Sequence, residues 1–597
     1  MEKWIKKIMQ FGGLFLFMSC NQPVDVVTID LSREEAEIPP SLYGIFFEEI
    51  THSGDGGLYA EMIRNRGFED GTLPSGTVLK DGKAVAKPLH CYSNDSINHF
   101  SIAWNDSLFM ESWEVKCVSD TRPPFYEITE VKPLNNATPH ALFIDLGASA
   151  SDVWVVNDGY WGIAVTEGQR YNFQFYLFTE ELKNTVVTAA LLDCEEQIVV
   201  SKNFQIERDG SWNHYEGAFT VDRTANDLRF ALLLPHKGKV YIDFVSMFPE
   251  NTFCGHKNGL REDVAGMLRD LRPDFVRWPG GCIVEGLTMD NRIKWKETIG
   301  DIVKRPGEYN LWGYRSTYGF GYHEFLQFCE DIDADGLFVC NAGMSCLFRN
   351  GDYWEEENRI DNLIQDALDA VEYALGDTTT VYGKRRAENG HAAPFPLKYV
   401  EVGNENVGLR YVKNYNRFYK AIKEKYPEMI VVGTVEPFNE GTDYVEGWKL
   451  ADKLGIPMVD EHYYQTPGWF LNNQDFYDKY DRSKKTKVYL GEYATHIPGR
   501  KANIETALTE ALYLAALERN GDVVHMTSYA PLLAKEGHTQ WNPDLIYFNN
   551  TEVKPTVGYY AQQMYGQNAG SEYIASSVTL DNAQDAVKKR VGVSVVR

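Results

Sequence analysis

The chain has 597 residues, 44% of them hydrophobic and 24% charged, so it is long enough for two or three domains. Its formal net charge is −26 and it has no basic cluster, which argues against nucleic acid as a partner and favours a neutral substrate. Aromatic residues reach 13%, a content that both large cores and sugar-binding clefts produce.

The first 20 residues are predicted to be an export signal. Lys3, Lys6 and Lys7 precede an apolar run, Ile8 to Met18, which is too short to span a bilayer stably. A cysteine follows a small residue at Cys20, as in a bacterial lipoprotein signal, where it would carry the lipid anchor. The alternative is an ordinary signal peptide cut nearby. Both predict an exported protein, periplasmic or at the cell surface.

The other eight cysteines are scattered without CxxC or metal-ligand spacing. Cys340 lies in an apolar run, which indicates a buried thiol. One or two disulfides among the other cysteines are an open alternative, and the sequence assigns no pairing. There is no HExxH motif and no His/Asp cluster, so no metal is expected.

Residues 38–67 are predicted to begin a barrel, with a strand from Ile38 to Phe47, a glycine turn and a helix starting at Leu58 to Ile63. Residues 68–250 show alternating strands without a helical period, which indicates an inserted all-β sandwich. The clearest of these strands are expected at 170–178, 185–192, 228–234 and 239–245.

Residues 254–530 alternate between apolar strands and helical patterns, such as the helices at 260–271 and 504–518. Together with the first strand they predict a (β/α)₈ barrel, within a multidomain α/β plus all-β protein. The eight expected strand ends are Glu48, Arg277, Asn341, Glu405, Val435, His462, Glu492 and Ser528. Residues 531–597 return to short strands, at 573–576 and 591–596, and are expected to form an incomplete C-terminal sandwich.

Two of these strand ends carry carboxylates. One strand stops at Gly403 and delivers Asn404 and Glu405, and another stops at Gly491 and delivers Glu492. Barrel enzymes place their chemistry at the carboxyl ends of the strands. A pair of carboxylates about 5–5.5 Å apart is what retaining glycoside cleavage requires, although the sequence alone does not assign the two roles.

Other polar residues at the strand ends are open to two interpretations. Arg277 either anchors a carboxylate or hydroxyl or forms a structural salt bridge, and either Glu48 or Glu49 faces a pocket unless both are solvated. His462 and Tyr464 are two residues apart on one strand, so they point to the same face. A tyrosine hydroxyl there can hold a nucleophilic carboxylate, whereas His462 is either a pocket residue or a satisfied core histidine.

The sequence resembles glycoside hydrolase family 51, the α-L-arabinofuranosidases. The shared motifs include Arg277-Trp-Pro-Gly-Gly-Cys282, Gly403-Asn-Glu-Asn406 and Gly491-Glu-Tyr493. Further matching stretches are 43–49, 56–69, 461–464 and 540–547, so the resemblance covers nearly all of the exported chain. The inserted sandwich resembles a carbohydrate-binding-module-like domain found in one branch of this family.

The resemblance implies a role for each matching residue. Glu405 corresponds to the acid/base of the family and Glu492 to its nucleophile. His462 corresponds to a residue that lines the sugar pocket. The residues that correspond to those holding a terminal arabinofuranose are Glu48, Arg277, Asn404, Tyr464 and Gln540. The family retains anomeric configuration and uses no cofactor.

The function expected from the sequence is that of an exported, exo-acting α-L-arabinofuranosidase, whose partner would be an arabinose-containing oligosaccharide or polysaccharide. One alternative is another barrel glycosidase activity, such as that of a β-xylosidase or an endoglucanase. A second alternative is a surface glycan-binding lipoprotein without catalysis. Both carboxylates are present, which argues against this second alternative.

Overall fold

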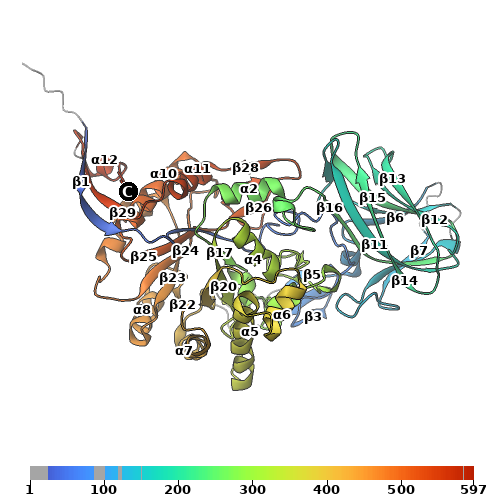
Figure 1. The fold of residues 1–597 in the computed structure, drawn as a ribbon, viewed down its shortest axis with the longest axis horizontal. Coiled ribbons are helices and arrows are strands. Elements are labelled where there is room, and N and C mark those ends of the chain that lie inside the picture. Colours follow the sequence, from blue (N-terminus) through green and yellow to red (C-terminus); the bar gives the residue numbers. More distant parts are fainter. Residues whose placement is uncertain (1–24, 87–100, 119–123, 149–150, 583) are drawn as a thin grey trace, which may run out of the picture.

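The computed structural model describes residues 25–86, 101–118, 124–148, 151–582 and 584–597. Figure 1 shows a barrel at the centre, a β-sandwich at one end of the long axis, and the pair of strands β1 and β29 at the other end. The predicted lipidation site, Cys20, lies outside the described residues. No helix in the described part of the chain combines the length and apolarity that a membrane crossing needs.

A closed barrel of eight strands forms the central body, in the order β17-β2-β25-β24-β23-β22-β21-β20. Every neighbouring pair is parallel. This confirms the predicted barrel. Its strands are β2 Tyr43–Phe46, β17 Phe275–Trp278, β20 Asp335–Cys340, β21 Leu397–Val402, β22 Ile430–Glu436, β23 Met458–Gln465, β24 Lys487–Thr495 and β25 Val524–Tyr529.

Helices between the strands cover the outside of the barrel (Figure 1). Successive side chains of a strand point to opposite faces, so the barrel strands contribute to two cores, one inside the barrel and one against the helices. In β21, Tyr399 packs inside the barrel, whereas Val400 and Val402 join the outer core with the helices. The helices are α2 Glu262–Asp270, α3 Cys282–Glu285, α4 Tyr322–Asp331, α5 Glu357–Leu375, α6 Val381–Glu388, α7 Gly408–Lys425, α8 Thr442–Leu454, α9 Pro467–Asn472, α10 Ile504–Arg519, α11 Val557–Gln567 and α12 Asp585–Lys588.

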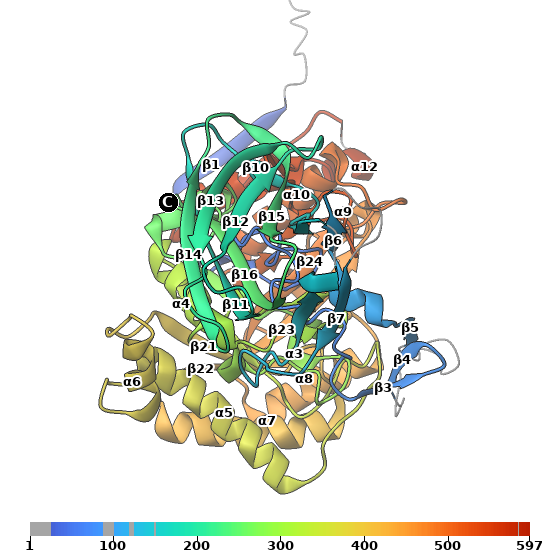
Figure 2. The same cartoon turned by 90° about the vertical axis from the view of Figure 1, so that its right-hand side faces the viewer.

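Two antiparallel sheets form the predicted sandwich, with the strand orders β13-β12-β15-β9-β6 and β14-β11-β16-β8-β7. Figure 2 shows this sandwich in front of the barrel, with the small sheet β3-β4-β5 at its side. The sandwich strands are β6 Trp113–Cys117, β7 Phe125–Thr129, β8 Ala141–Asp145, β9 Val153–Asn157, β10 Ile163–Val165, β11 Arg170–Glu180, β12 Val186–Leu192, β13 Ile198–Gln205, β14 Trp212–Thr220, β15 Ala225–Leu234 and β16 Lys239–Pro249. The smaller pieces are β3 Thr77–Lys80, β4 Lys83–Ala86, β5 Ser101–Ala103, β18 Glu308–Tyr309 and β19 Arg315–Ser316.

The sandwich is joined to the barrel by packing and by hydrogen bonds. Ile63 and Phe68, which follow the first barrel strand, are buried in the core of the sandwich. On the other side, the Asn550 amide donates to the carbonyl oxygens of Tyr160 at 3.1 Å and Gly162 at 2.7 Å. The ring of His538 stacks on Trp161 of the sandwich. The two bodies therefore share a packed interface and are more than consecutive domains on one chain.

The helix predicted to start at Leu58 to Ile63 does not form, because tertiary contacts override the helical pattern there. Tyr59 makes isolated bridges to Asp55 and Leu260, and the residues that follow it are extended or in turns. The buried Glu61 carboxylate accepts the backbone N–H groups of Met62 and Ile63, at 3.1 Å each. These bonds satisfy the backbone without a helix.

The C-terminal region differs from the prediction of strands alone. It contains a three-stranded sheet, the unpredicted helix α11, and the antiparallel pair of β1 and β29. The segment 591–596 is no strand, and only Val596 bridges to Tyr573. The strands here are β1 Val26–Glu37, β26 Leu533–Lys535, β27 Ile546–Phe548, β28 Val553–Pro555 and β29 Glu572–Thr579. No sandwich forms among the described residues of 531–597.

Glu510 on α10 makes stability depend on pH. Its carboxyl group is buried against the N–H of Thr495, and burial raises its pKa to about 8. The folded chain therefore binds a proton that the unfolded chain releases at the ordinary glutamate pKa. We expect Glu510→Gln to gain stability over the wild type as the pH rises from about 5 to about 8, by up to about 1.4 kcal/mol per pH unit.

Urea unfolding at a series of pH values measures this difference. Glu505→Gln is the matched control, because Glu505 lies on the same helix and is exposed. If the stabilities of Glu510→Gln and the wild type change in parallel from about pH 5 to about pH 8, the Glu510 carboxyl group of the folded chain is not protonated there.

Candidate active site

Glu405 and Glu492 come from two strands of the barrel and meet at its carboxyl-terminal mouth. Glu405 follows β21, whereas Glu492 lies within β24, which continues past the predicted strand end at Gly491 to Thr495. One oxygen of each carboxylate and one ring nitrogen of His462 all lie within 4.8 Å of one another. This close approach suits a retaining pair, whose carboxyl groups lie about 5–5.5 Å apart.

The backbone after β21 turns sharply to present Glu405. Gly403 has a φ of 83°, and Glu405 itself has a φ of 50°, a conformation that non-glycine residues rarely adopt. Such strain costs on the order of 1–3 kcal/mol and persists only where surrounding contacts impose it. The Glu405 side chain stays 12% exposed, so it reaches the open side of the pocket.

The Glu492 carboxylate has one oxygen held and one oxygen free. The Tyr464 hydroxyl donates to Oε2 at 2.7 Å, while Oε1 lies 3.7 Å from the Arg277 guanidinium. Within the described structure, Oε1 accepts no hydrogen bond. Burial raises the pKa of Glu492, and the positive charges of His462 and Arg277 oppose that rise. These cations therefore favour an ionised carboxylate with an oxygen available to attack.

His462 bridges the catalytic pocket and the buried layer beneath it. Its Nδ1 lies 3.0 Å from a Glu405 oxygen, and its Nε2 lies 2.7 Å from the Asp460 carboxylate. Burial opposes the charge on the ring, but Asp460 and Glu492 outweigh burial and raise the pKa of His462 well above its ordinary value. The structure places His462 between both strand-end carboxylates with both ring nitrogens bonded, and its contact with a sugar stays a prediction.

Arg277 is fully buried and organises the floor of the site. Its guanidinium lies 3.4 Å from Glu401 and 3.2 Å from Asp460, and it donates to the Asn404 amide oxygen at 2.8 Å. The structural salt bridge expected of Arg277 is therefore present, whereas its direct contact with a sugar stays a prediction. It forms a buried ion-pair cluster, and it also orients a polar side chain of the pocket.

Asn404 is fixed from both sides of its amide group. Its oxygen accepts from Arg277, and its nitrogen donates to Glu285 at 3.2 Å. Asn406 donates to the other Glu285 oxygen at 2.9 Å. Because both asparagines are held by one buried carboxylate, the segment that carries Glu405 is set in place by α3.

Glu48 faces the site, whereas Glu49 does not. Glu48 accepts the N–H of Ile283 at 3.0 Å and the indole N–H of Trp312 at 3.1 Å. Burial, and then the neighbouring Glu492 charge, raise the pKa of Glu48 to about 8, so it is protonated at neutral pH. Glu49 instead accepts a hydrogen bond from Tyr314 at 2.8 Å.

Two glycines leave room for these carboxylates. A Cβ at Gly281 would lie 2.8 Å from the free oxygen of Glu492, and a Cβ at Gly491 would lie 2.1 Å from Asp460. Any side chain at either position would displace a carboxylate of the site. The Pro-Gly-Gly and Leu-Gly-Glu motifs of the sequence therefore have a steric reason.

Gln540 lies on the rim, in the loop between β26 and β27, and is exposed. It has no hydrogen bond to another site residue in the described structure. Its neighbour Trp541 packs against Tyr464, with ring centroids 5.6 Å apart, and lies near Trp312 at 6.5 Å. Aromatic side chains therefore form one wall of the mouth.

Sequence reasoning missed several residues of the site. Asp460 shares its strand face with His462 and Tyr464, so the same two-residue spacing could have indicated it. Trp541 directly follows the predicted Gln540. Trp312, Glu285 and Cys346 lie outside the strand ends, and no spacing in the sequence points to them.

A parallel barrel with two close carboxylates at its mouth defines this chain as a glycoside hydrolase. It is 32% identical over 593 residues to alpha-L-arabinofuranosidase 1 of Arabidopsis thaliana, covering 95% of this chain and 79% of that protein. An arabinose-bound α-L-arabinofuranosidase structure, MgGH51, superposes with a TM-score of 0.77 at 27% identity, over 92% of this chain and 84% of that one. The chain belongs to the α-L-arabinofuranosidases of family GH51.

Three further matches agree with this assignment. Residues 267–482 match the alpha-L-arabinofuranosidase 1 domain, and residues 477–591 match the alpha-L-arabinofuranosidase C-terminal domain. An extracellular exo-alpha-L-arabinofuranosidase of Streptomyces chartreusis is 36% identical over 566 residues. That alignment covers 93% of this chain and 62% of the relative, so this chain spans less than two thirds of the relative's length.

Proposed function

We propose that this chain is a retaining, exo-acting α-L-arabinofuranosidase that releases terminal arabinofuranose from arabinan or arabinoxylan and their fragments. The observation that carries the proposal is the approach of the Glu405 and Glu492 oxygens within 4.8 Å at the barrel mouth. Membership of the α-L-arabinofuranosidase family supports the choice of sugar.

In the first step, Glu405 protonates the departing glycosidic oxygen while Glu492 attacks the anomeric carbon. Oε1 of Glu492 is the attacking atom, because Tyr464 already occupies Oε2. The bond from the anomeric carbon to the departing oxygen breaks, and a glycosyl-enzyme ester forms. The departing alcohol carries away the Glu405 proton.

In the second step, Glu405 removes a proton from water, which attacks the anomeric carbon and releases Glu492. His462 lies 3.0 Å from Glu405 and 3.7 Å from Glu492, so it stays near both carboxylates while charge moves between them. Asn404 and the protonated Glu48 would hold the sugar hydroxyls, since each is oriented by fixed neighbours.

We also propose that the protein is exported and anchored by a lipid on Cys20, at the periplasmic or outer face of a bacterial cell. The charged and apolar N-terminal segment that ends at Cys20 supports this proposal. The extracellular relative of Streptomyces chartreusis supports export alone. Radiolabelled palmitate incorporation that Cys20→Ala removes would test the anchor.

Hydrolysis of p-nitrophenyl α-L-arabinofuranoside by residues 21–597, beside the β-xyloside and the glucoside, tests the proposed activity. We expect rapid release from the arabinoside alone, and a first product of retained configuration by NMR. Preference for the xyloside or glucoside would instead support another barrel glycosidase. Binding of arabinan by a folded sample that releases nothing would support a glycan-binding lipoprotein.

A further inference from the structure

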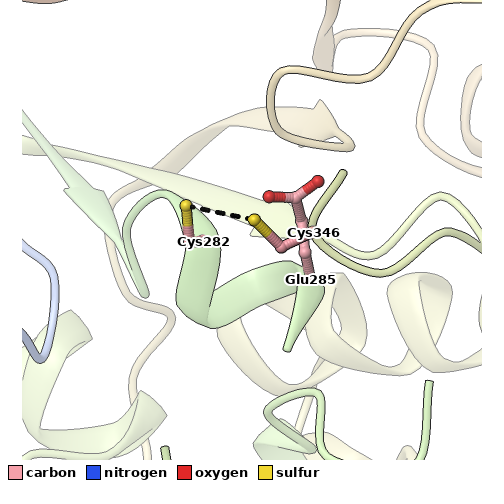
Figure 3. Close-up of side chains that lie close together, drawn as sticks. All are labelled: Cys282, Glu285 and Cys346. Atoms are coloured by element: carbon pink, nitrogen blue, oxygen red, sulfur yellow. Dashed lines mark hydrogen bonds between the residues drawn. The ribbon is translucent and has the colours of Figure 1, made fainter. Parts of the chain in front are cut away.

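Two cysteines and a glutamate converge beside the sugar pocket, in a cluster that the proposed reaction does not use. Cys282 and Glu285 begin and end helix α3, and Cys346 comes from the loop after β20. The two sulfur atoms lie 3.6 Å apart. One ligand atom from each of the three residues lies within 4.8 Å of the others. Figure 3 shows the sulfur atoms facing each other, with the Glu285 carboxylate beside Cys346.

The spacing of the sulfur atoms fits two thiolates on one cation. A tetrahedral Zn²⁺ with Zn–S distances of about 2.3 Å holds its two sulfurs about 3.8 Å apart. The observed 3.6 Å is close to this value. A disulfide, at about 2.05 Å, would require the sulfurs to approach by about 1.5 Å.

The backbone around the cluster is held in place. The Asn341 amide donates to the carbonyl oxygen of Val284 at 3.1 Å and to that of Met344 at 3.0 Å. The N–H of Cys346 donates to Gly286 at 3.1 Å. These bonds join α3 to the loop that carries Cys346. The two segments thus keep their relative position without a bound cation.

Glu285 has the outer contacts of a metal-ligating carboxylate. It is 1% exposed, and each of its oxygens accepts a hydrogen bond from an amide, that of Asn404 or that of Asn406. Metal-ligating carboxylates are themselves usually oriented by such bonds, and each oxygen keeps a lone pair for a cation. Cys282 is partly exposed whereas Cys346 is buried, so the open side of the cluster lies at Cys282.

We propose that Cys282, Cys346 and Glu285 bind one thiophilic divalent cation of the Zn²⁺ class, with water in the fourth position. Binding displaces the protons of the two thiols and of Glu285, whose pKa burial raises well above its ordinary value, and these protons leave to solvent. No oxidation takes place. Three protein ligands and one open position are a common arrangement for such cations.

Cobalt titration of the reduced full chain tests the site without relying on catalysis. We expect one Co²⁺ per chain, with the thiolate-to-cobalt charge-transfer band in the near ultraviolet. Cys282→Ser and Cys346→Ser should each remove this band and weaken binding at least 100-fold. Cys194→Ser and Cys254→Ser are matched controls, because these exposed cysteines lie elsewhere, and both should keep the band.

Asn406→Ala provides a second measurement that leaves every ligand in place. We expect it to weaken cobalt binding by about 10- to 100-fold through the loss of one bond to Glu285. Circular dichroism without metal confirms that each variant is folded. The proposal is wrong if the folded, reduced protein gives no band, or if Cys282→Ser keeps it. A Cys282–Cys346 disulfide in exported protein purified without reductant would also overturn it.

Zinc should also inhibit hydrolysis, an effect that rests on the proposed function. Glu285 would share its charge between the cation and Asn404, the side chain that precedes the acid/base. We expect Zn²⁺ to lower the rate on the arabinoside in the wild type and not in Cys346→Ser. If cobalt binds in the wild type but Zn²⁺ leaves its rate unchanged, the site stands and its link to catalysis is wrong.

Discussion

Replacing Glu492 by alanine will lower kcat on an unactivated arabinoside by roughly 10⁴- to 10⁶-fold. The covalent step loses its nucleophile, and the remaining site can only bind the sugar and orient water. The geometry behind this expectation is the free Oε1 of Glu492 beside Tyr464 and Arg277. Steady-state and single-turnover rates on an arabino-oligosaccharide measure the loss.

Glu492→Gln is the matched control, because it keeps the shape of the side chain and still lacks a nucleophilic oxygen. It should lose activity as severely as the alanine variant. Added azide should rescue Glu492→Ala on an activated substrate and give a glycosyl azide of inverted configuration, since azide then attacks from the side that Glu492 occupied. A variant that keeps a tenth of the wild-type rate would remove Glu492 from the nucleophile role.

Replacing Glu405 by alanine will lower kcat/KM by different factors for substrates with different leaving groups. An arabino-oligosaccharide needs protonation of its departing oxygen, so we expect a loss of about 10²- to 10⁴-fold in kcat/KM. A p-nitrophenyl arabinoside departs as a stable anion and should lose far less. The ratio of the two kcat/KM values, measured in the wild type and the variant, is the readout.

The configuration of the azide product distinguishes the two carboxylates. With Glu405→Ala the glycosyl-enzyme on Glu492 still forms, so azide should give a product of retained configuration. Glu405→Gln keeps the contact to His462 within reach and should show the same separation of substrates. Equal losses on both substrates would mean that Glu405 is not the proton donor.

Much of the barrel could be predicted because its signals are local. Each strand is a short apolar run that ends at a polar residue, and helical patterns separate the runs. The carboxylates at 405 and 492 follow such runs directly, so topology alone brings them to one mouth. His462 and Tyr464 were correctly placed on one face, since both reach Glu492.

Residues whose positions depend on contacts between distant segments could not be predicted. Cys282 and Cys346 are 64 positions apart and meet because Asn341, and the bond from Cys346 to Gly286, join their segments. The helix expected after Gly57 failed because Glu61 and Tyr59 are held by partners elsewhere in the chain. Local propensity gives way to such contacts wherever the tertiary structure supplies them.

The interface between the sandwich and the barrel limits how the sandwich domain can be exchanged or lost during evolution. Ile63 belongs to the barrel segment of the chain and is buried in the core of the sandwich, and Asn550 bonds to the sandwich from the C-terminal region. The sandwich is therefore not an independent domain that recombination can exchange by cutting the chain at a linker. Deleting residues 68–250 would expose the apolar side chain of Ile63 to water and leave the Asn550 amide without its carbonyl partners. A homologue without the sandwich would need compensating substitutions at the positions of both Ile63 and Asn550.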